Sequence, residues 1–342
     1  MALIDYDIAD DSYYLFTCAE LKAREIELIE KSKIDRMLSV AGVDDFFKIL
    51  QETWYSKYIS DIEKDKSFNS TMVSEYRSAI NFLNERLIKQ HQAAILLLML
   101  KEILHNLKII IKSFILNKDL KELFFPVMYD CDQLKSAAES GNYKDIDPYA
   151  AKILQYGMEL VEKKESYRSI ELKLELFYLE NIFDSVKKIG SRMLMDFLRY
   201  IIDIFNIKNI YRYKYTQEKL DFNTFLHKNG FLSVDFLEKF KSESIDYFVQ
   251  SMGRTEYATI IIKGTHSLYT DISFSSFERN EDMFYLRFFD LVKYTVSNLE
   301  RVFAFFIRKK LELKILNIIY MGLLYDVEKG KVKRKVEILN EY

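Results

Sequence analysis

The chain has 342 residues, of which 49% are hydrophobic and 30% are charged, and its formal net charge is −2. A chain of this length and composition buries a large core, which excludes a disordered protein, and its near-neutral charge excludes a strongly basic nucleic-acid-binding domain. Only 2 prolines and 9 glycines occur. Because these residues interrupt helices and build hairpin turns, their scarcity predicts an almost wholly helical fold.

The cysteines and the N-terminus predict the compartment. Cys18 and Cys131 are far apart and form no Cys-x-x-Cys pattern, which is typical of a protein inside the cell. The N-terminus is rich in aspartate, the opposite of the basic head of a signal peptide, so no export is expected. The longest apolar runs, 93–100 and 315–325, are shorter than the ~20 residues of a membrane-spanning helix, so we expect the chain not to cross a bilayer.

The N-terminal region predicts two amphipathic helices that pack together. Asp11 and Ser12 are expected to cap a helix from about Tyr13 to Met37. Its packing side is expected to contain Leu15, Cys18, Ala19, Ile26 and Ile29. Gly42 ends the turn that follows, and Asp44–Asp45 is interpreted as the N-cap of the second helix. That helix carries Phe46, Phe47, Ile49, Leu50, Trp54 and Tyr58, and polar residues 64–67 predict an exposed connection after it.

A mostly apolar helical pattern follows from 94 to 116, and such a helix is buried on most sides. Its polar positions recur at steps of four, three and four, which places them along one stripe. These positions are Lys101, His105, Lys108 and Lys112.

The middle of the chain carries clear helix boundaries. Gly141–Asn142 is expected to stop a helix, and Asp147–Pro148 supplies a capping carboxylate followed by proline at the first helical position. Gly190–Ser191 predicts a break and a restart. Asn229–Gly230 is interpreted as a C-cap pair, and Ser233 is expected to open a short helix.

The last third is less regular. Glycines, threonines and serines surround a β-branched run at 260–262, so residues 251–276 are left open between a short strand and irregular loops. A long helical pattern then extends from about Phe277 to Tyr325. Near the C-terminus, Lys329, Lys331, Lys333, Arg334 and Lys335 cluster. They are interpreted either as a solvated helix end or as a surface that meets anionic lipid or an acidic partner.

The chain also repeats itself. Residues 104–112 match 204–212, and the match continues without a gap because Leu120 corresponds to Leu220 and Phe125 to Phe225. A fainter third copy lies 109 positions beyond the second, where Phe306 corresponds to Phe197 and Glu312 to Asp203. Self-similarity at a fixed offset indicates one supersecondary unit used several times. We therefore expect three related lobes, approximately 1–125, 126–230 and 231–342, arranged as a ring or funnel.

Motifs of catalytic chemistry are absent from the sequence. Gly330–Lys331 is followed by Val332, which excludes a P-loop. The Asp44–Asp45 pair has no third carboxylate such as magnesium-dependent prenyl-diphosphate enzymes use. The four histidines show no His-x3-His spacing or His-Asp pairing for a metal site, and no Gly-x-Ser-x-Gly elbow occurs. The four histidines are His91, His105, His227 and His266. We expect no catalytic residue, no cofactor and no metal ion.

The residues of the repeat motif are instead expected to be structural. A buried amide costs free energy unless it is hydrogen-bonded, so Asn106 and Asn206 should satisfy neighbouring backbone or side-chain groups. The basic pairs Lys108 with Lys112 and Lys208 with Arg212 are expected to reach a surface or to pair with carboxylates. The candidate structural residues are Asn106, Lys108, Asp203, Asn206, Lys208, Arg212 and Glu312.

Several motifs in order resemble the C subunit of the V-type and A-type rotary ATPases, which is named d in the eukaryotic enzyme. The opening helix of that family resembles the pattern formed here by Tyr14, Ala19, Arg24 and Glu25. Its next motif, a leucine followed by Glu-Thr and a tyrosine, is similar to residues 50–55. His-Asn-Leu-Lys stands at 105–108 and Asp-x-x-Asn-Ile-Lys at 203–208. Phe277-Glu278-Arg279 with Asp282 resembles the family's Phe-Glu-Arg-x-x-Asp.

Three positions depart from the family pattern. Ile103 replaces the acidic residue three before the first asparagine, and Phe231 replaces a second glycine after Gly230. The final motif, Glu-x-x-Asn-Leu-Arg in the family, has Ile315 in place of its asparagine and Asn317 in place of its arginine.

The resemblance, which spans about 14–339, implies a pseudo-threefold helical funnel at the cytoplasmic face of the membrane. It implies that the funnel sits on the rotor ring, receives the central stalk and transmits torque, while other subunits handle ATP and the assembly moves protons or sodium ions. The expected partners are central-stalk and rotor-ring subunits, with no nucleic acid and with membrane association only through the ring. Two alternatives remain, a helical scaffold that binds peptide or protein partners and a helical enzyme with a diffuse site. Repeat offsets of about 100 residues disfavour a solenoid scaffold, whose repeats are ~34–47 residues long.

Overall fold

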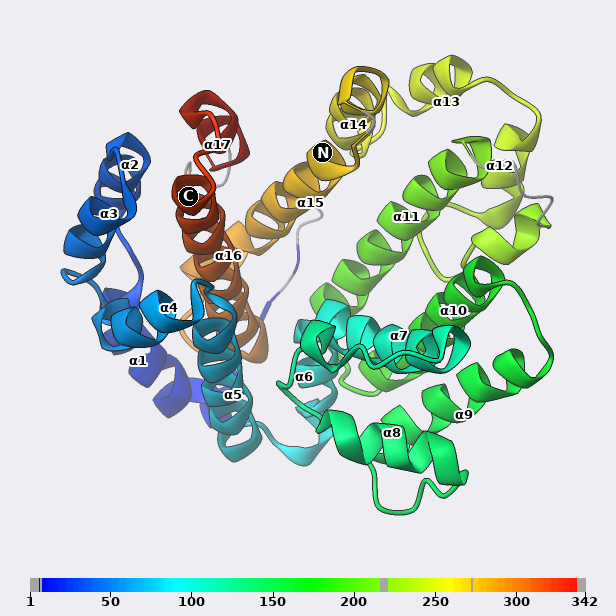
Figure 1. Cartoon of the computed structure of the whole chain (residues 1–342), viewed down its shortest axis with the longest axis horizontal. Coiled ribbons are helices and arrows are strands. Elements are labelled where there is room, and N and C mark those ends of the chain that lie inside the picture. The colour runs from blue at the N-terminus through cyan, green and yellow to red at the C-terminus, as the bar shows by residue number, and fades with distance from the viewer. Residues whose placement is uncertain (1–5, 7, 216–220, 272, 337–342) are drawn as a thin grey trace. The chain divides into compact units, whose positions relative to one another are not determined.

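The computed structural model describes residues 6, 8–215, 221–271 and 273–336. Within these ranges the chain forms helices joined by turns, and no strand occurs there (Figure 1). The predicted all-α class is therefore confirmed. None of the described helices combines the length and the apolar character that spanning a bilayer would need.

The chain divides into two compact units. One, here called the discontinuous unit, combines residues 1–82 with 255–342, and the other, the continuous unit, is formed by 83–254. The first unit is thus built from both ends of the chain.

The helices of the discontinuous unit come from the two ends of the chain. Its α-helices are α1 (Leu15–Arg24), α2 (Lys31–Ser39), α3 (Val43–Leu50), α4 (Ile59–Asp65), α5 (Asn69–Arg86, which ends in the continuous unit), α14 (Ala258–Asp271), α15 (Ser275–Phe288), α16 (Leu299–Leu324) and α17 (Lys329–Val336). Short 3₁₀ helices lie at Ser12–Tyr14, Glu25–Glu27, Trp54–Tyr58 and Phe289–Tyr294. The long α16 is the common partner, because α1, α3, α15 and α17 all pack against it.

The continuous unit is organised around α7 and α10, which pack on each other and on α9. Its α-helices are α6 (Ala93–Leu98), α7 (Leu100–Leu116), α8 (Cys131–Ser140), α9 (Pro148–Glu162), α10 (Tyr167–Lys187), α11 (Arg192–Tyr215), α12 (Val234–Glu238) and α13 (Ile245–Met252). Its 3₁₀ helices are Lys89–His91, Lys121–Leu123, Phe222–Phe225 and Lys239–Lys241.

Most predicted helix boundaries are confirmed. The Asp147 carboxylate accepts hydrogen bonds from the backbone N–H of Tyr149 (3.0 Å) and Ala150 (2.9 Å), with Pro148 at the first helical position. Gly141 and Gly190 adopt φ of 66° and 84° at the predicted stops. Glycine reaches this left-handed region without the steric cost that other residues meet.

The single helix predicted from Tyr13 to Met37 is wrong. The chain leaves helical conformation at Leu28 and Glu30, where ψ is 142° and 144°, and α2 starts afresh at Lys31. The predicted packing side is also largely wrong, because Cys18 is buried whereas Leu15 and Ile26 are 53% and 90% exposed. Apolar residues lie both on the buried side of α1, as at Leu21, and on its exposed side, as at Phe16, so the hydrophobic pattern did not define which side faces the core.

The second predicted helix needs two corrections. It ends at Leu50, and Trp54 and Tyr58 belong to a separate 3₁₀ helix. Its N-cap is Gly42, while Asp44 and Asp45 lie in the first turn, where carboxylates are favoured by the helix dipole. The expected packing between the two predicted helices is present, through α2 and α3.

The region left open at 251–276 is helical, so neither a strand nor irregular loops describe most of it. Ile260 and Ile261 are buried in α14, which packs on α15. Gly264 permits this approach, because a Cβ there would lie 2.4 Å from the Phe277 ring. Tertiary packing thus overrides the β-branched propensity. The predicted continuous helix from Phe277 to Tyr325 is interrupted between Phe288 and Leu299.

The basic C-terminal cluster lies mainly on α17. This helix docks through Val336, which is fully buried, and through Val332 against Gly322. Its basic side chains face solvent, as the interpretation of a solvated helix end expects.

Candidate functional site

Each asparagine of the first two repeat copies fastens a loop to its helix. Asn106 in α7 donates from Nδ2 to the Phe125 carbonyl (2.6 Å) and accepts from the Phe125 N–H (2.8 Å). Asn206 in α11 makes the same pair of hydrogen bonds with the His227 carbonyl (2.8 Å) and N–H (2.7 Å). Both amides therefore make the hydrogen bonds that their burial requires.

The ungapped match between Phe125 and Phe225 is wrong in detail. The backbone group that pairs with Asn206 belongs to His227, two residues beyond Phe225. Phe225 instead accepts a hydrogen bond from Asn209 Nδ2 (2.9 Å). The second copy thus carries two additional residues between its asparagine and the residue equivalent to Phe125.

Asp203 of α11 binds the backbone of the turn at 230–232. Its fully buried carboxylate accepts hydrogen bonds from the N–H groups of Phe231 (3.0 Å) and Leu232 (3.1 Å). Gly230 makes this approach possible, because a Cβ there would lie 1.9 Å from Asp203 Oδ1. The predicted helix C-cap at Asn229–Gly230 is wrong, since α11 ends at Tyr215 and Gly230 lies in a turn.

The basic residues of two repeat copies converge on one carboxylate in the continuous unit. Glu175 of α10, only 2% exposed, lies 2.8 Å from Lys108 Nζ of α7 and 3.9 Å from an Arg212 nitrogen of α11. Glu171 adds a second carboxylate 3.2 Å from Lys108, and Arg212 also donates to Asn209 Oδ1 (2.9 Å). We call these five side chains the Glu175 cluster.

Neighbouring charges favour the ionised forms of Glu175 and Lys108. Burial alone would raise the pKa of Glu175, but the neighbouring charges of Lys108 and Arg212 outweigh burial and lower it. Burial alone would lower the pKa of Lys108, but Glu175 and Glu171 raise it. The cluster therefore ties α7, α10 and α11 together through charge-assisted contacts to the buried carboxylate of Glu175.

Lys208 and Lys112 lie elsewhere on the same helices. Lys208 is half-buried on α11. Lys112 Nζ lies over the Tyr167 ring, 5.4 Å from its centroid. The i,i+4 repetition of basic residues thus places only one member of each pair, Lys108 and Arg212, in the Glu175 cluster.

Glu312, the third-copy counterpart of Asp203, also accepts backbone and side-chain donors. It accepts hydrogen bonds from the Ile29 N–H, at the break before α2, and from the Tyr55 hydroxyl (2.6 Å). Burial raises the pKa of Glu312, while Lys309, Tyr55 and Ile29 lower it without cancelling the effect of burial.

Around Glu312 lies a second buried ionic group, here called the Lys309 cluster. Lys309 Nζ is 3.7 Å from Glu75, 3.8 Å from Glu27 and 3.9 Å from Glu312. The Tyr58 hydroxyl and the Trp54 indole N–H donate to Glu75 at 2.7 and 3.2 Å. Helices α5 and α16 and the segment before α2 are thereby joined.

The two clusters contain residues that sequence analysis did not select. No repeat motif includes the buried charged residues Glu175, Lys309, Glu27 and Glu75, and in the sequence they resemble ordinary surface charges. The only local signal of a buried charge was a charged residue inside an apolar helical stretch, as at Lys309. Among the described residues, no group of three or more His, Cys, Asp or Glu side chains is arranged to hold a metal ion.

Comparisons with known proteins identify the family. The family model described as ATP synthase (C/AC39) subunit matches residues 17–335. The chain is 22% identical to the C subunit of the V-type sodium ATPase of Enterococcus hirae, over 88% of this chain and 91% of that protein. It is 19% identical to the C subunit of the A-type ATP synthase of Methanocaldococcus jannaschii, over 95% of this chain and 86% of that protein. Because the family model spans nearly the whole chain, the protein belongs to the ATP synthase (C/AC39) subunit family of the V- and A-type ATPases.

Proposed function

We propose that this protein is the socket that links the central stalk of a V- or A-type rotary ATPase to its membrane rotor ring. In this role it transmits torque during ATP-coupled proton or sodium transport. The observation that carries the proposal is the family match over residues 17–335, together with two relatives named as C subunits of such ATPases.

The proposed body is a funnel of three related lobes, approximately 1–125, 126–230 and 231–342. The equivalent hydrogen bonds of Asn106 and Asn206 support a relation between the first two lobes. The buried carboxylates Asp203 and Glu312, which both accept backbone N–H groups, support a relation between the second and the third.

A torque-transmitting subunit must resist bending more than it must bind a small molecule. The Glu175 cluster fastens three helices of one unit, and the Lys309 cluster fastens helices from both ends of the chain in the other. Buried charge pairs of this kind fix the relative positions of helices, because separating them would leave uncompensated charges inside the protein. These rigid connections support a mechanical role.

In this proposal the protein is not catalytic and binds no cofactor, and ATP is handled by other subunits. It lies at the cytoplasmic face of the membrane and is held there through the rotor ring. Its partners are the central-stalk and rotor-ring subunits.

Co-purification tests the proposal. We expect a tagged full-length chain, expressed in its own host and extracted in mild detergent, to bring down stalk and ring subunits of one ATPase. We also expect membranes that lack the chain to lose coupling between ATP hydrolysis and ion transport. Recovery of neither set of subunits would overturn the proposal, and recovery of unrelated peptide-bearing partners would favour the scaffold alternative.

A further inference from the structure

The Lys309 cluster places three carboxylates around one ammonium group. Lys309 Nζ lies 3.7 Å from Glu75, 3.8 Å from Glu27 and 3.9 Å from Glu312, and these distances are too long for hydrogen bonds. All four side chains belong to residues that are at most 9% exposed. The lysine alone therefore compensates the three buried negative charges only in part.

Glu312 is the carboxylate with the least compensation. Glu27 also pairs with Arg24 (3.0 Å), and Glu75 also pairs with Lys57 (3.3 Å). Within the described part of the chain, Lys309 is the only ion-pair partner of Glu312. The other two groups that bind its oxygens, the Ile29 N–H and the Tyr55 hydroxyl, are neutral.

The hydrogen bonds of Glu312 suit a carboxyl group that carries a proton. Oε2 accepts from the Ile29 N–H, which can only donate. Oε1 lies 2.6 Å from the Tyr55 hydroxyl, which can either donate or accept because its hydrogen rotates. A proton on Oε1 can therefore be donated to the Tyr55 oxygen while Oε2 keeps its backbone donor.

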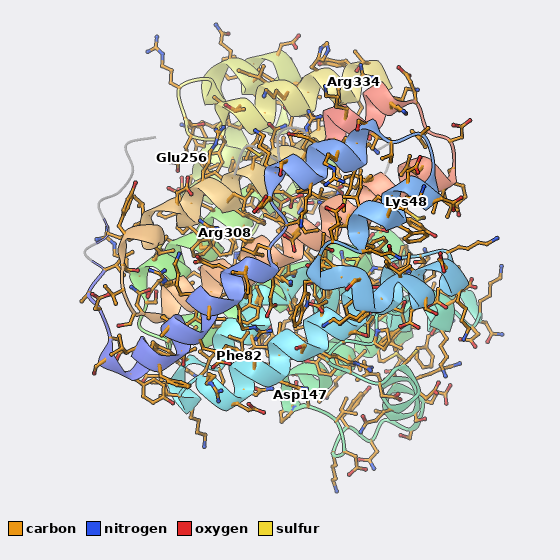
Figure 2. The ribbon with its side chains drawn as sticks, turned by 90° about the vertical axis from the view of Figure 1, so that its left-hand side faces the viewer. Lys48, Phe82, Asp147, Glu256, Arg308 and Arg334 are labelled. Carbon is orange, nitrogen blue, oxygen red and sulfur yellow. The ribbon has the colours of Figure 1, made fainter. Side chains whose placement is uncertain are left out.

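A pocket connects Glu312 with solvent. Glu312 and Ile29 line a pocket of about 220 Å³, together with the exposed residues Glu30 and Lys31 and with Arg308, which is labelled in Figure 2. A polar pocket of this size is large enough to admit water. Water can thus carry a proton between solvent and the buried carboxyl group.

We propose that Glu312 is a proton-binding site inside the discontinuous unit. In the folded protein its carboxyl group takes one proton from solvent onto Oε1 and donates it in a hydrogen bond to the Tyr55 hydroxyl oxygen. Loss of this proton returns a third negative charge to the surroundings of Lys309. The contacts that join α16 to the N-terminal segments at Ile29 and Tyr55 therefore become less favourable as the pH rises.

The pKa of Glu312 has the direction that this site requires. Burial raises the pKa of Glu312 and so does the charge of Glu75, whereas Lys309, Tyr55 and Ile29 lower it without restoring the ordinary value of 4.5. The folded protein thus binds this proton more tightly than the unfolded chain does. The stability that the proton adds is fully present below about pH 4.5 and is lost as the pH rises through the folded-state pKa.

Other titratable and charged groups surround the site on every element packed against it. Those at the surface, Glu30, Lys31 and Lys57, have charges that water and salt screen. Arg308 lies 3.9 Å from Asp290. The complete set is Arg24, Glu27, Glu30, Lys31, Tyr55, Lys57, Tyr58, Glu75, Tyr76, Asp290, Arg308 and Lys309.

Infrared spectroscopy of the folded full-length chain tests the site. Glu312→Gln is neutral and can offer an oxygen to Ile29 and an N–H to Tyr55, as the protonated carboxyl group does. Glu63→Gln, at an exposed glutamate of α4 in the same unit, is the matched control. The carbonyl band of protonated carboxyl groups is recorded for both variants and the wild type across the acidic and neutral pH range.

Each difference between wild type and variant isolates the titration of one glutamate. We expect the difference for Glu312→Gln to show one protonated carboxyl group that persists to a higher pH than the one revealed by Glu63→Gln. Equal midpoints, or a lower midpoint for Glu312, would overturn the proton-binding site.

The single tryptophan provides a measurement that needs no variant. The Trp54 indole N–H donates to Glu75 (3.2 Å), and Lys309 Nζ lies 5.9 Å from the Trp54 ring centroid. Fluorescence of the folded wild type should therefore change as Glu312 titrates, at a pH above 4.5. A Glu312→Gln variant that folds should lack this step. A flat wild-type response above pH 4.5, or a step retained in the variant, would contradict the proposal.

Discussion

Asn106 and Asn206 use both atoms of the side-chain amide to pair with both backbone groups of a single residue in the following loop. An amide buried in an apolar helix would cost free energy without such partners, so each asparagine specifies where its loop is attached. The same pair of contacts in two copies supports the internal repeat more specifically than shared hydrophobic positions do.

We expect His227 to make the stability of the second repeat copy depend on pH. The ring is only 2% exposed, and Nδ1 accepts a hydrogen bond from the Asn229 N–H (3.1 Å). Among the described residues, its Nε2 has no hydrogen-bond partner. Burial and, to a lesser extent, the charge of Lys228 lower the pKa of His227 to about 4 from 6.5. The folded protein therefore favours the neutral ring.

We predict that His227 destabilises the fold as the solution becomes acidic. A lowered folded-state pKa means that this residue costs no stability above about pH 6.5, and that the cost grows as the pH falls and levels off near pH 4. The expected cost at pH 5 is about 2 kcal/mol. Urea unfolding of the wild type and of His227→Gln at pH 7.5 and pH 5 measures it. Equal losses in the two proteins would contradict this prediction.

At the scale of elements, hydrogen bonds attach the turn at 230–232 to α11. Asp203 on the helix accepts two N–H groups of the turn, and Gly230 lets the turn come close enough. The sequence predicted Asp203 as a structural residue of the repeat and Gly230 as part of a helix C-cap. The contact between them forms only because the chain folds back after more than twenty residues, and no local sequence pattern predicts that.

We predict that Gly230→Ala is strongly destabilising. The added Cβ would displace the Asp203 carboxylate, and a buried carboxylate that loses its donors costs about 2–4 kcal/mol in unfolding free energy. Gly42→Ala is the matched control, because no atom lies within 4 Å of a Cβ at that position. Its expected change is about 1 kcal/mol or less, because Gly42 is the N-cap of α3 and alanine caps a helix less well than glycine. Chemical denaturation measures both variants, and similar values for the two would refute the role of Gly230.

At the scale of the whole molecule, the discontinuous unit depends on contacts between the two ends of the chain. Glu312 accepts hydrogen bonds from Ile29 and Tyr55, and the Tyr320 ring lies 5.9 Å from Phe46 and 5.8 Å from Phe47, centroid to centroid. The core around α3 is therefore incomplete without α16. The continuous unit takes its helices from one stretch of sequence.

We predict that the two units differ as fragments. Residues 83–254 alone should keep a helical circular-dichroism spectrum and unfold cooperatively, because their core is self-contained. Residues 1–82 alone should show no cooperative transition, and co-expression with 255–342 should restore one. A cooperative transition in isolated 1–82 would contradict this division.

The sequence by itself determined the helical class, most helix boundaries and the need for hydrogen bonds at Asn106 and Asn206. Those features depend on residues within about one helical turn of each other or on overall composition. Its motifs also indicated the family that the comparisons then established.

Only the tertiary structure decided which charges pair and which faces are buried. Glu175 lies 67 residues from Lys108, and Glu312 lies 257 residues from Tyr55, so their contacts arise only when distant helices pack. The exposed side of α1, the break at 28–30 and the helix at 258–271 likewise depend on which apolar surfaces are buried when distant segments pack. Local periodicity cannot show which of several apolar surfaces will be buried.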